Sequence, residues 1–105
     1  MKAILINAES RTITQVEIEK KNVLEQWYKL IGCETVETAF YLNKEMDNLL
    51  VDEEGLLKFE KNFFTYEGCP QPYAGNGLIV GNNLKTGDTI SPTLTLEEVT
   101  RKVMF

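Results

Sequence analysis

Hydrophobic positions follow two different spacings along the chain, and the changes of spacing divide it into elements. Apolar residues run together over 3–6, and they recur at about every second position over 12–19. Both patterns are typical of β-strands, so the chain is predicted to open with two strands. Because Ile13 is out of phase with Val16 and Ile18, we expect a bulge or a late start in the second strand.

The spacing becomes helical between 23 and 31, where apolar side chains recur at intervals of three and four residues. Asn22 with Glu25 three residues later fits a capping box, and Gly32 fits the residue that ends a helix. We therefore predict a helix over 23–31, with Trp27 as a core anchor rather than a binding platform.

Period two then returns and predicts a strand over 36–42, with all its even-numbered residues on one face. Farther on, the apolar runs 49–51 and 56–57 flank the turn-like tetrapeptide Asp52–Gly55. Aspartate suits the first position of a turn and glycine accepts a positive φ, so we predict a hairpin with carboxylates at its tip. A calcium loop is the alternative, but residues 46–57 lack the ligand spacing of an EF-hand.

Half of the ten aromatic residues fall between 59 and 76. Pro70 and Pro72 exclude a helix there, which leaves a long ordered loop or a partial strand. Long loops in compact domains are often functional, so this segment is where we place a ligand or partner site. The alternative is that its phenylalanines cover one edge of the core. The candidate residues are Asn62, Phe64, Tyr66, Gln71, Tyr73 and Asn76.

Residues 77–81 predict a buried strand between glycines, and these glycines do not form a nucleotide loop because no helix follows them. Thr95 with Glu98 is a second capping box, which predicts a short C-terminal helix after Pro92.

Together the elements predict one α+β domain over 1–105. It would have a mixed, mainly antiparallel sheet of about five to six strands, with the main helix packed on one face.

Composition narrows the chemistry. The chain has 105 residues, no histidine, and 11 basic against 16 acidic residues, for a net charge of −5. Without histidine a hydrolase triad or a zinc site is disfavoured, and Cys33 and Cys69 are too far apart for a redox pair. No basic stripe favours direct nucleic-acid binding, and no apolar run is long enough for a signal peptide or a membrane span. We expect no metal, no cofactor and a cytoplasmic location.

The negative charge is concentrated in the middle of the chain. Residues 36–69 carry three basic and eight acidic residues, whereas the flanking thirds are balanced. This segment could face a basic protein partner, but a solvated hairpin rim is the simpler explanation and is favoured. The candidate acidic surface consists of Glu45, Asp47, Asp52, Glu53 and Glu54.

Several short motifs, taken in order, resemble a family of small proteins from bacteriophages, plasmids and Gram-positive bacteria whose function is not established. The motifs are Glu53-Glu54-Gly55-Leu56, Asn62, Ala74-Gly75, Leu78-Ile79-Val80-Gly81 and Leu94-Thr95-Leu96-Glu97-Glu98. Leu56 stands where the family usually has lysine. The resemblance implies a mobile-element context but supplies no activity, catalytic residue or cofactor.

Three hypotheses follow for the function. The first is a non-enzymatic accessory protein of a phage or mobile element that binds a host or defence-system protein or a small ligand. The second is a small-molecule-binding or enzymatic domain in the loop 59–76, where Cys69 would be a nucleophile if Lys58 or Lys61 lowered its pKa, and where Glu60 and Glu67 are carboxylates. The third is a module that associates with itself, as a homodimer, through an exposed sheet edge.

Overall fold

The computed structural model describes residues 1–58 and 61–105, and within them the chain folds as α+β with a main sheet, a second small sheet and two α-helices. The strands are β1 (Lys2–Asn7), β2 (Thr12–Glu17), β3 (Val36–Tyr41), β4 (Asn48–Asp52), β5 (Phe63–Tyr66), β6 (Tyr73–Ala74), β7 (Gly77–Asn82), β8 (Thr89–Ile90) and β9 (Val103–Met104). The helices are α1 (Val23–Ile31), α2 (Leu96–Lys102) and the 3₁₀-helix η1 (Gly55–Lys58).

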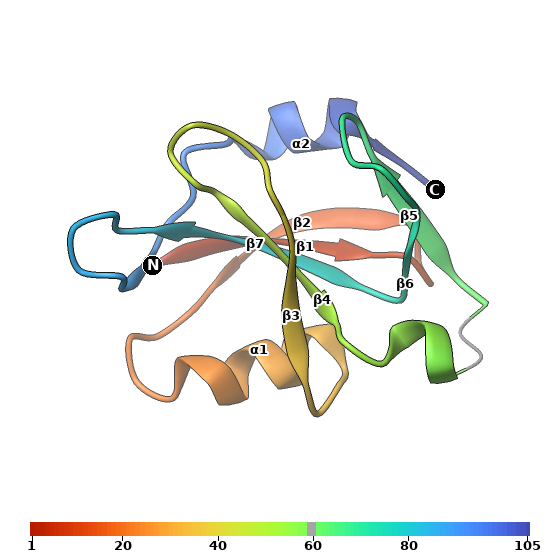
Figure 1. The fold of residues 1–105 in the computed structure, drawn as a ribbon, viewed down its shortest axis with the longest axis horizontal. Helices are drawn as coiled ribbons and strands as arrows, with labels where there is room; N and C mark the ends of the chain where they lie inside the picture. Colours follow the sequence, from red (N-terminus) through yellow and green to blue (C-terminus); the bar gives the residue numbers. More distant parts are fainter. Residues whose placement is uncertain (59–60) are drawn as a thin grey trace.

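The main sheet has the order β2-β1-β7-β4-β3, with β8 paired to β7 beyond that path, and the small sheet has the order β6-β5-β9. Every strand pair among the described residues is antiparallel. α1 covers one face of the main sheet, while α2 and β5 lie on the opposite side (Figure 1). The predicted α+β class is therefore confirmed, and the sheet is covered on both faces.

Two cores result from this arrangement, one on each face of the main sheet. The first core includes Ile4, Leu49 and Ile79 and is closed by Phe64 of β5 and Val99 of α2. The second contains side chains of the same strands that point the other way, together with Ile31 of α1; its buried members are Ala3, Ile18, Ile31, Leu50, Leu78 and Val80. Each strand of the sheet interior thus carries apolar residues at consecutive positions rather than at every second one.

The two cores explain why the expected bulge in the second strand was wrong. β1 pairs with β2 in unbroken register from Lys2 opposite Glu17 to Asn7 opposite Thr12. Ile13 packs against the first core, whereas Val16 packs against the second. The residues are out of phase because both faces of the strand are covered.

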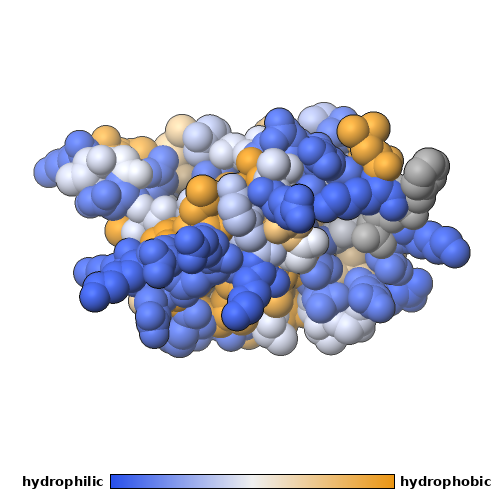
Figure 2. All heavy atoms as spheres, turned by 90° about the horizontal axis from the view of Figure 1, so that it is seen from below, coloured by the Kyte–Doolittle hydropathy of each residue, from blue (hydrophilic) through white to orange (hydrophobic). Residues whose placement is uncertain are grey.

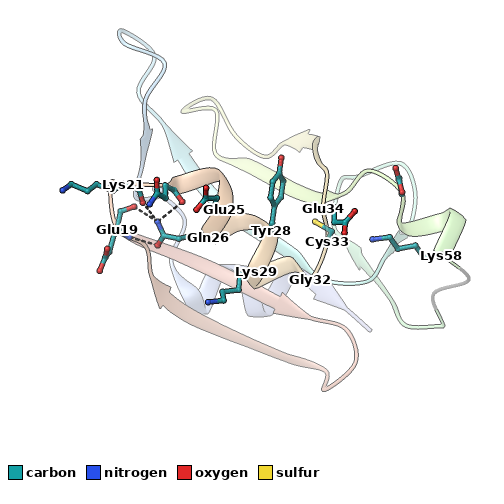
Figure 3. A pocket seen from close by; sticks show the side chains of 12 residues that line it. Glu19, Lys21, Glu25, Gln26, Tyr28, Lys29, Gly32, Cys33, Glu34 and Lys58 are labelled. Carbon is teal, nitrogen blue, oxygen red and sulfur yellow. Dashed lines mark hydrogen bonds between the residues drawn. The ribbon is translucent and has the colours of Figure 1, made fainter.

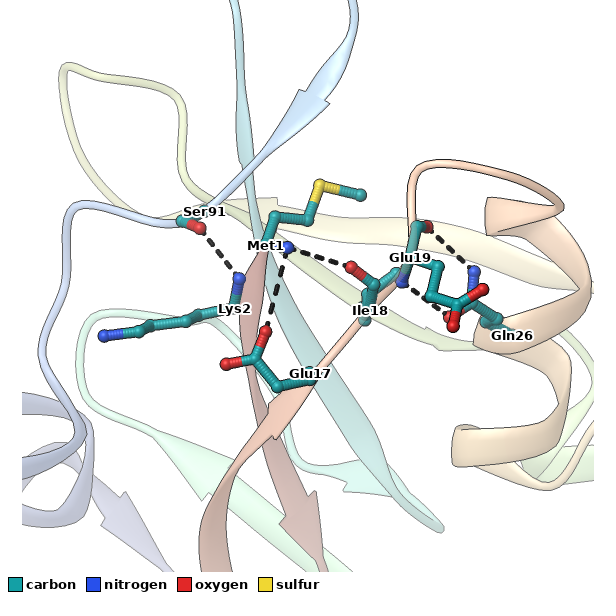
Figure 4. Close-up of polar contacts among 7 residues, drawn as sticks. All are labelled: Met1, Lys2, Glu17, Ile18, Glu19, Gln26 and Ser91. Carbon is teal, nitrogen blue, oxygen red and sulfur yellow. Dashed lines mark hydrogen bonds and ion pairs between the residues drawn. The ribbon is translucent and has the colours of Figure 1, made fainter.

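α1 has the predicted bounds, and Gly32 ends it with a φ of 83°, as expected. The predicted capping box at Asn22 is wrong, because Asn22 adopts a left-handed φ of 53° and makes no side-chain cap bond within the described residues. The Gln26 side chain holds the preceding loop instead. Its amide donates to the Glu19 carbonyl at 2.9 Å and its oxygen accepts from the Glu19 N–H (Figure 4). The amide also donates to the Lys21 carbonyl at 2.8 Å. Trp27 packs against the second core.

β3 departs from the predicted single face. Its register with β4 shifts between Thr38 and Phe40, which is a β-bulge. Val36 consequently packs against the second core, whereas Leu42 packs against the first. The bulge lies on one of the two edge strands of the main sheet, since β3 and β2 end its order.

The hairpin predicted over 49–57 is wrong. β4 ends at Asp52, and the chain turns into η1 instead of forming a returning strand. β4 pairs with β3 and β7, so both of its edges are already occupied. Gly55 is required by a close approach and not by a positive φ, because a Cβ there would lie 3.0 Å from the Ala74 carbonyl oxygen.

The C-terminal half follows the sequence more closely. β7, predicted as a buried strand, lies in the middle of the main sheet. Thr95 accepts from the Glu98 N–H and Glu98 accepts in return from the Thr95 N–H, so the predicted capping box of α2 is confirmed. The segment 59–76 contains β5 and β6; Phe59 and Glu60 lie outside the described residues.

Candidate functional site

The aromatic residues proposed as a ligand platform form part of the first core. Phe64, Tyr66 and Tyr73 are buried, and the Phe64 and Tyr73 rings lie 5.7 Å apart between centroids. Alternation in β5 places these side chains against the main sheet, because Phe64 and Tyr66 share one face of that strand. Their assignment as binding residues is therefore corrected, because all three side chains lie in the core. The alternative interpretation, that the phenylalanines cover the core, holds for Phe64 but not for Phe63, which is 42% exposed.

Burial also determines the ionisation of these groups. Desolvation raises the pKa of Tyr66 and of Tyr73 to about 12 in each case. The Tyr66 hydroxyl is buried without a hydrogen-bond partner among the described residues. Both tyrosines therefore stay protonated near neutral pH.

The acidic candidates do not form one surface. Asp47 is fully buried, and it accepts hydrogen bonds from the Thr93 N–H and hydroxyl, the Leu94 N–H and the Asn43 amide, at 2.9 to 3.1 Å. It fixes the segment before α2 to the β3–β4 loop, so its assignment to a partner surface was wrong. Glu45 is exposed on that same loop, at the opposite end of β4 from Glu53.

At that other end, Asp52 and η1 form a rigid corner. The Asp52 side chain is only 9% exposed, and its Oδ2 lies 2.8 Å from the Lys58 Nζ. Its Oδ1 accepts from the Glu54 N–H at 2.9 Å. The hydrogen bond that the Lys58 ammonium donates to Asp52 raises the pKa of Lys58. We call Asp52–Lys58 the β4–η1 corner.

The outward side of the β4–η1 corner carries exposed acids and exposed leucines. Glu53 and Glu54 are exposed, and the Leu56 and Leu57 side chains are 70% and 77% exposed. Seen from the side of α1, an apolar projection stands over η1 among hydrophilic surroundings (Figure 2). We call these four residues the acidic-leucine knob. The sequence pattern missed it because the two leucines were assigned to a strand.

The inward side of the corner borders a polar cavity of about 230 Å³. Five separate parts of the chain contribute its lining, which consists of Glu9, Ile31, Gly32, Asp52, Gly55, Lys58, Asn62, Ala74, Gly75 and Asn76. The Asn76 Oδ1 accepts from the Ala8 N–H at 3.0 Å, and the Gly75 N–H donates to the Asn62 carbonyl at 2.8 Å. The first bond holds the β6–β7 turn against the β1–β2 turn, and the second holds it against the residue before β5.

The predicted site residues are thus divided between different places. Asn62, Asn76 and Asp52 come together in the polar cavity, although the sequence assigned them to two different surfaces. Gln71 is exposed outside it and lines a small hollow of about 50 Å³ beside Leu56. Glu9 and Lys58 were missed as cavity residues, since neither belongs to a motif.

Beside the cavity an open groove of about 960 Å³ runs along α1. It shares Gly32 and Lys58 with the polar cavity, and the Lys58 side chain points from η1 toward Cys33 (Figure 3). Burial and the Asp52 charge raise the pKa of the Cys33 thiol, while Lys58 opposes the shift. Burial also raises the pKa of Cys69. Neither cysteine therefore has the lowered pKa of an activated nucleophile.

Residues 1–58 and 61–105 contain neither a cluster of metal ligands nor a membrane-spanning helix. No three His, Cys, Asp or Glu residues of this part lie together so that they would hold a metal ion. No helix of the same part is long and apolar enough to span a membrane.

Comparison with known proteins gives one match. Residues 1–103 match the model of a family described as a domain of unknown function, DUF3846. No curated protein and no solved structure matches the chain. The origin in phages or plasmids stays a prediction, while the resemblance to a family of unknown function is confirmed over almost the whole sequence. The chain belongs to the DUF3846 family.

Proposed function

We propose that this protein is a non-enzymatic binding module that attaches to a partner protein through the acidic-leucine knob. The observation that carries the proposal is the pair of leucines, 70% and 77% exposed, on a 3₁₀-turn beside two exposed glutamates. Burying a leucine side chain contributes about 2 kcal/mol, so a surface that keeps two of them adjacent in water is suited to contact with another protein.

The knob is held in place, as a binding element requires. Gly55 packs against the Ala74 carbonyl of β6, and the Asp52–Lys58 pair closes the turn from the other side. A turn fixed before binding loses little conformational entropy when it docks. The partner chemistry that fits is an apolar pocket with a basic rim, which would receive the leucines and pair with Glu53 and Glu54.

Two alternative functions have less support. An enzymatic role for Cys69 is disfavoured because its pKa is raised by burial and Lys58 pairs with Asp52 instead. Self-association along the edge of β3 is disfavoured by the bulge between Thr38 and Phe40, which interrupts edge-to-edge pairing; the opposite edge, β2, has no such bulge. The homodimer, the role in a mobile element and the absence of nucleic-acid binding all stay predictions.

The test compares the proteins that the wild-type chain and two variants capture from a cell lysate. The lysate comes from cells that carry the gene or, if the gene belongs to a phage, from the host of that phage. Leu56→Ser with Leu57→Ser removes the apolar contact. Leu84→Ser is the matched control, because Leu84 is 66% exposed on the β7–β8 turn, away from the knob. We expect the double variant to lower the captured amount of a partner at least about tenfold, and the control to leave it unchanged.

Quantitative mass spectrometry of the captured proteins measures both effects. Equal capture by the wild type and the double variant would contradict the proposal, provided that circular dichroism shows the variant folded. Loss of capture in the Leu84 variant alone would place the binding surface elsewhere.

A further inference from the structure

The polar cavity has a defined electrostatic sign. Asp52 and Lys58 neutralise one another at 2.8 Å, and Glu9 makes no ion pair within the described residues. The described part of the cavity wall therefore carries one unbalanced negative charge, that of Glu9. Asp52 is nine-tenths buried and is held by Lys58, whereas Glu9 is exposed on the β1–β2 turn at the rim of the cavity.

The end of α1 adds negative potential at the same place. Gly32 and Cys33 both donate their N–H groups to the Tyr28 carbonyl, at 2.8 and 3.0 Å, so the later carbonyls of the last turn have no partner within the helix. Ile31 and Gly32, at this C-terminal end, line the cavity. The C-terminal end of a helix carries the negative pole of its dipole and favours cations.

The volume of the cavity and the groups that line it limit the class of ligand further. At about 30 Å³ per water molecule, 230 Å³ corresponds to about eight waters, which suits a small organic molecule. Asn62 and Asn76 also line the cavity, and side-chain amides recognise amide or hydroxyl groups, although the Asn76 Oδ1 already accepts from the Ala8 N–H. A divalent metal is disfavoured, because no three acidic or thiol ligands of the described chain lie together. An anion would face the wrong end of α1.

We propose that the polar cavity binds a small organic cation with a primary ammonium group and an amide or hydroxyl group. The ammonium lies between the Glu9 carboxylate and the C-terminal end of α1, and the polar group faces the asparagines. The contact between Lys58 and Asp52 shows that an ammonium is already held at this wall by a carboxylate. The site is separate from the acidic-leucine knob, which lies on the outward side of the β4–η1 corner.

The test is a titration of the full chain with β-alaninamide, followed by ¹H–¹⁵N nuclear magnetic resonance. Propionamide, which lacks the ammonium, and succinamate, which replaces it by a carboxylate, serve as matched probes at equal ionic strength. We expect β-alaninamide to shift the backbone amides of Gly32, Gly75 and Asn76 saturably, and the two other probes not to do so. Saturable shifts of the same amides with succinamate or propionamide, or none with β-alaninamide, would overturn the proposal.

A pair of variants tests the assigned charge. Glu9→Gln removes the unpaired carboxylate and keeps its shape, and we expect it to weaken β-alaninamide binding at least about 5-fold. Glu45→Gln makes the same change of net charge on an exposed loop at the far end of β4 and should leave affinity unchanged. Equal affinities for the wild type and the Glu9 variant would overturn the assignment. Binding by the Leu56 and Leu57 double variant should stay at the wild-type level, so this proposal and the proposed function fail independently.

Discussion

Asp47 and Asp52 bracket the same strand, yet the structure holds them in opposite ways. Asp47 is fully buried and accepts main-chain and side-chain hydrogen bonds from Thr93 and Leu94, which come from a distant part of the sequence. Asp52 is held by the Lys58 ammonium and by a neighbouring N–H, and it borders a cavity. One end of β4 is thus committed to the fold, while the other end borders a cavity, where we propose that a ligand binds.

The largest effect is expected at the committed end. Asp47→Asn replaces an acceptor oxygen by an amide donor that faces the N–H groups of Thr93 and Leu94. We expect the free energy of unfolding to fall by about 3 kcal/mol, because buried donors lose a charged acceptor. Urea denaturation monitored by circular dichroism measures the change.

Glu45→Gln is the control for that variant, since it changes an exposed carboxylate two residues away. It should alter the free energy of unfolding by less than about 0.5 kcal/mol. A loss below about 1 kcal/mol for Asp47→Asn would mean that the hydrogen-bond network does not hold the segment before α2.

A smaller effect is expected at the available end. Asp52→Asn keeps an acceptor for the Glu54 N–H but removes the charge that faces Lys58. Because the Lys58 side chain is 43% exposed, solvent screens the pair, and we expect a loss of about 1 kcal/mol. If Asp52→Asn lowered the free energy of unfolding as much as Asp47→Asn or more, the two ends of β4 would not differ in their contribution to stability.

The same pair has a defined pH dependence. The folded state raises the pKa of Lys58 above the ordinary value of 10.5, so the stabilisation is complete below that value and is lost as pH rises through the folded pKa. Lys58→Met should remove this alkaline loss from the unfolding free energy. Denaturation at pH 8 and at pH 11 in both proteins separates it from other titrations.

The smallest effect is expected at a buried polar atom without a partner. Tyr66→Phe removes a hydroxyl that has no hydrogen-bond partner among the described residues, so we expect a change within about 1 kcal/mol, neutral or stabilising. In the wild type, the raised pKa of about 12 keeps this tyrosine protonated while the unfolded state ionises near pH 10. Stability is therefore lost between these values, and the variant should lose less. A clear destabilisation would reveal a hidden partner.

Local signals in the sequence predicted local structure well. The bounds of α1 and the capping box of α2 depend on residues within one or two helical turns of each other, and both are confirmed. The predicted hairpin after β4 failed because its partner was decided elsewhere: β7, about thirty residues later, pairs with β4 in place of 56–57. Ile13 was misread because nothing in its own strand shows that both faces are covered.

Part of the candidate site was also predicted from local signals in the sequence. Asn62, Asn76 and Asp52 were identified as polar residues near glycines and turns, and they do line one cavity. The aromatic residues were misplaced because their density was interpreted as a platform, whereas β5 turns them toward the core. The burial of Asp47 depends on Thr93, 46 positions away, and no local pattern indicates such a partner.

The central position of β7 bears on how the chain is made. β7 pairs with β1, from the first residues, and with β4, so the main sheet lacks its middle until residue 82 has been synthesised. On the ribosome, the β1–β2 and β3–β4 hairpins emerge before β7. Until β7 follows, the backbone N–H and C=O groups on the edges of β1 and β4 that pair with it lack those partners. Contacts so distant along the chain slow folding and leave nascent strands open to chaperones or to wrong partners.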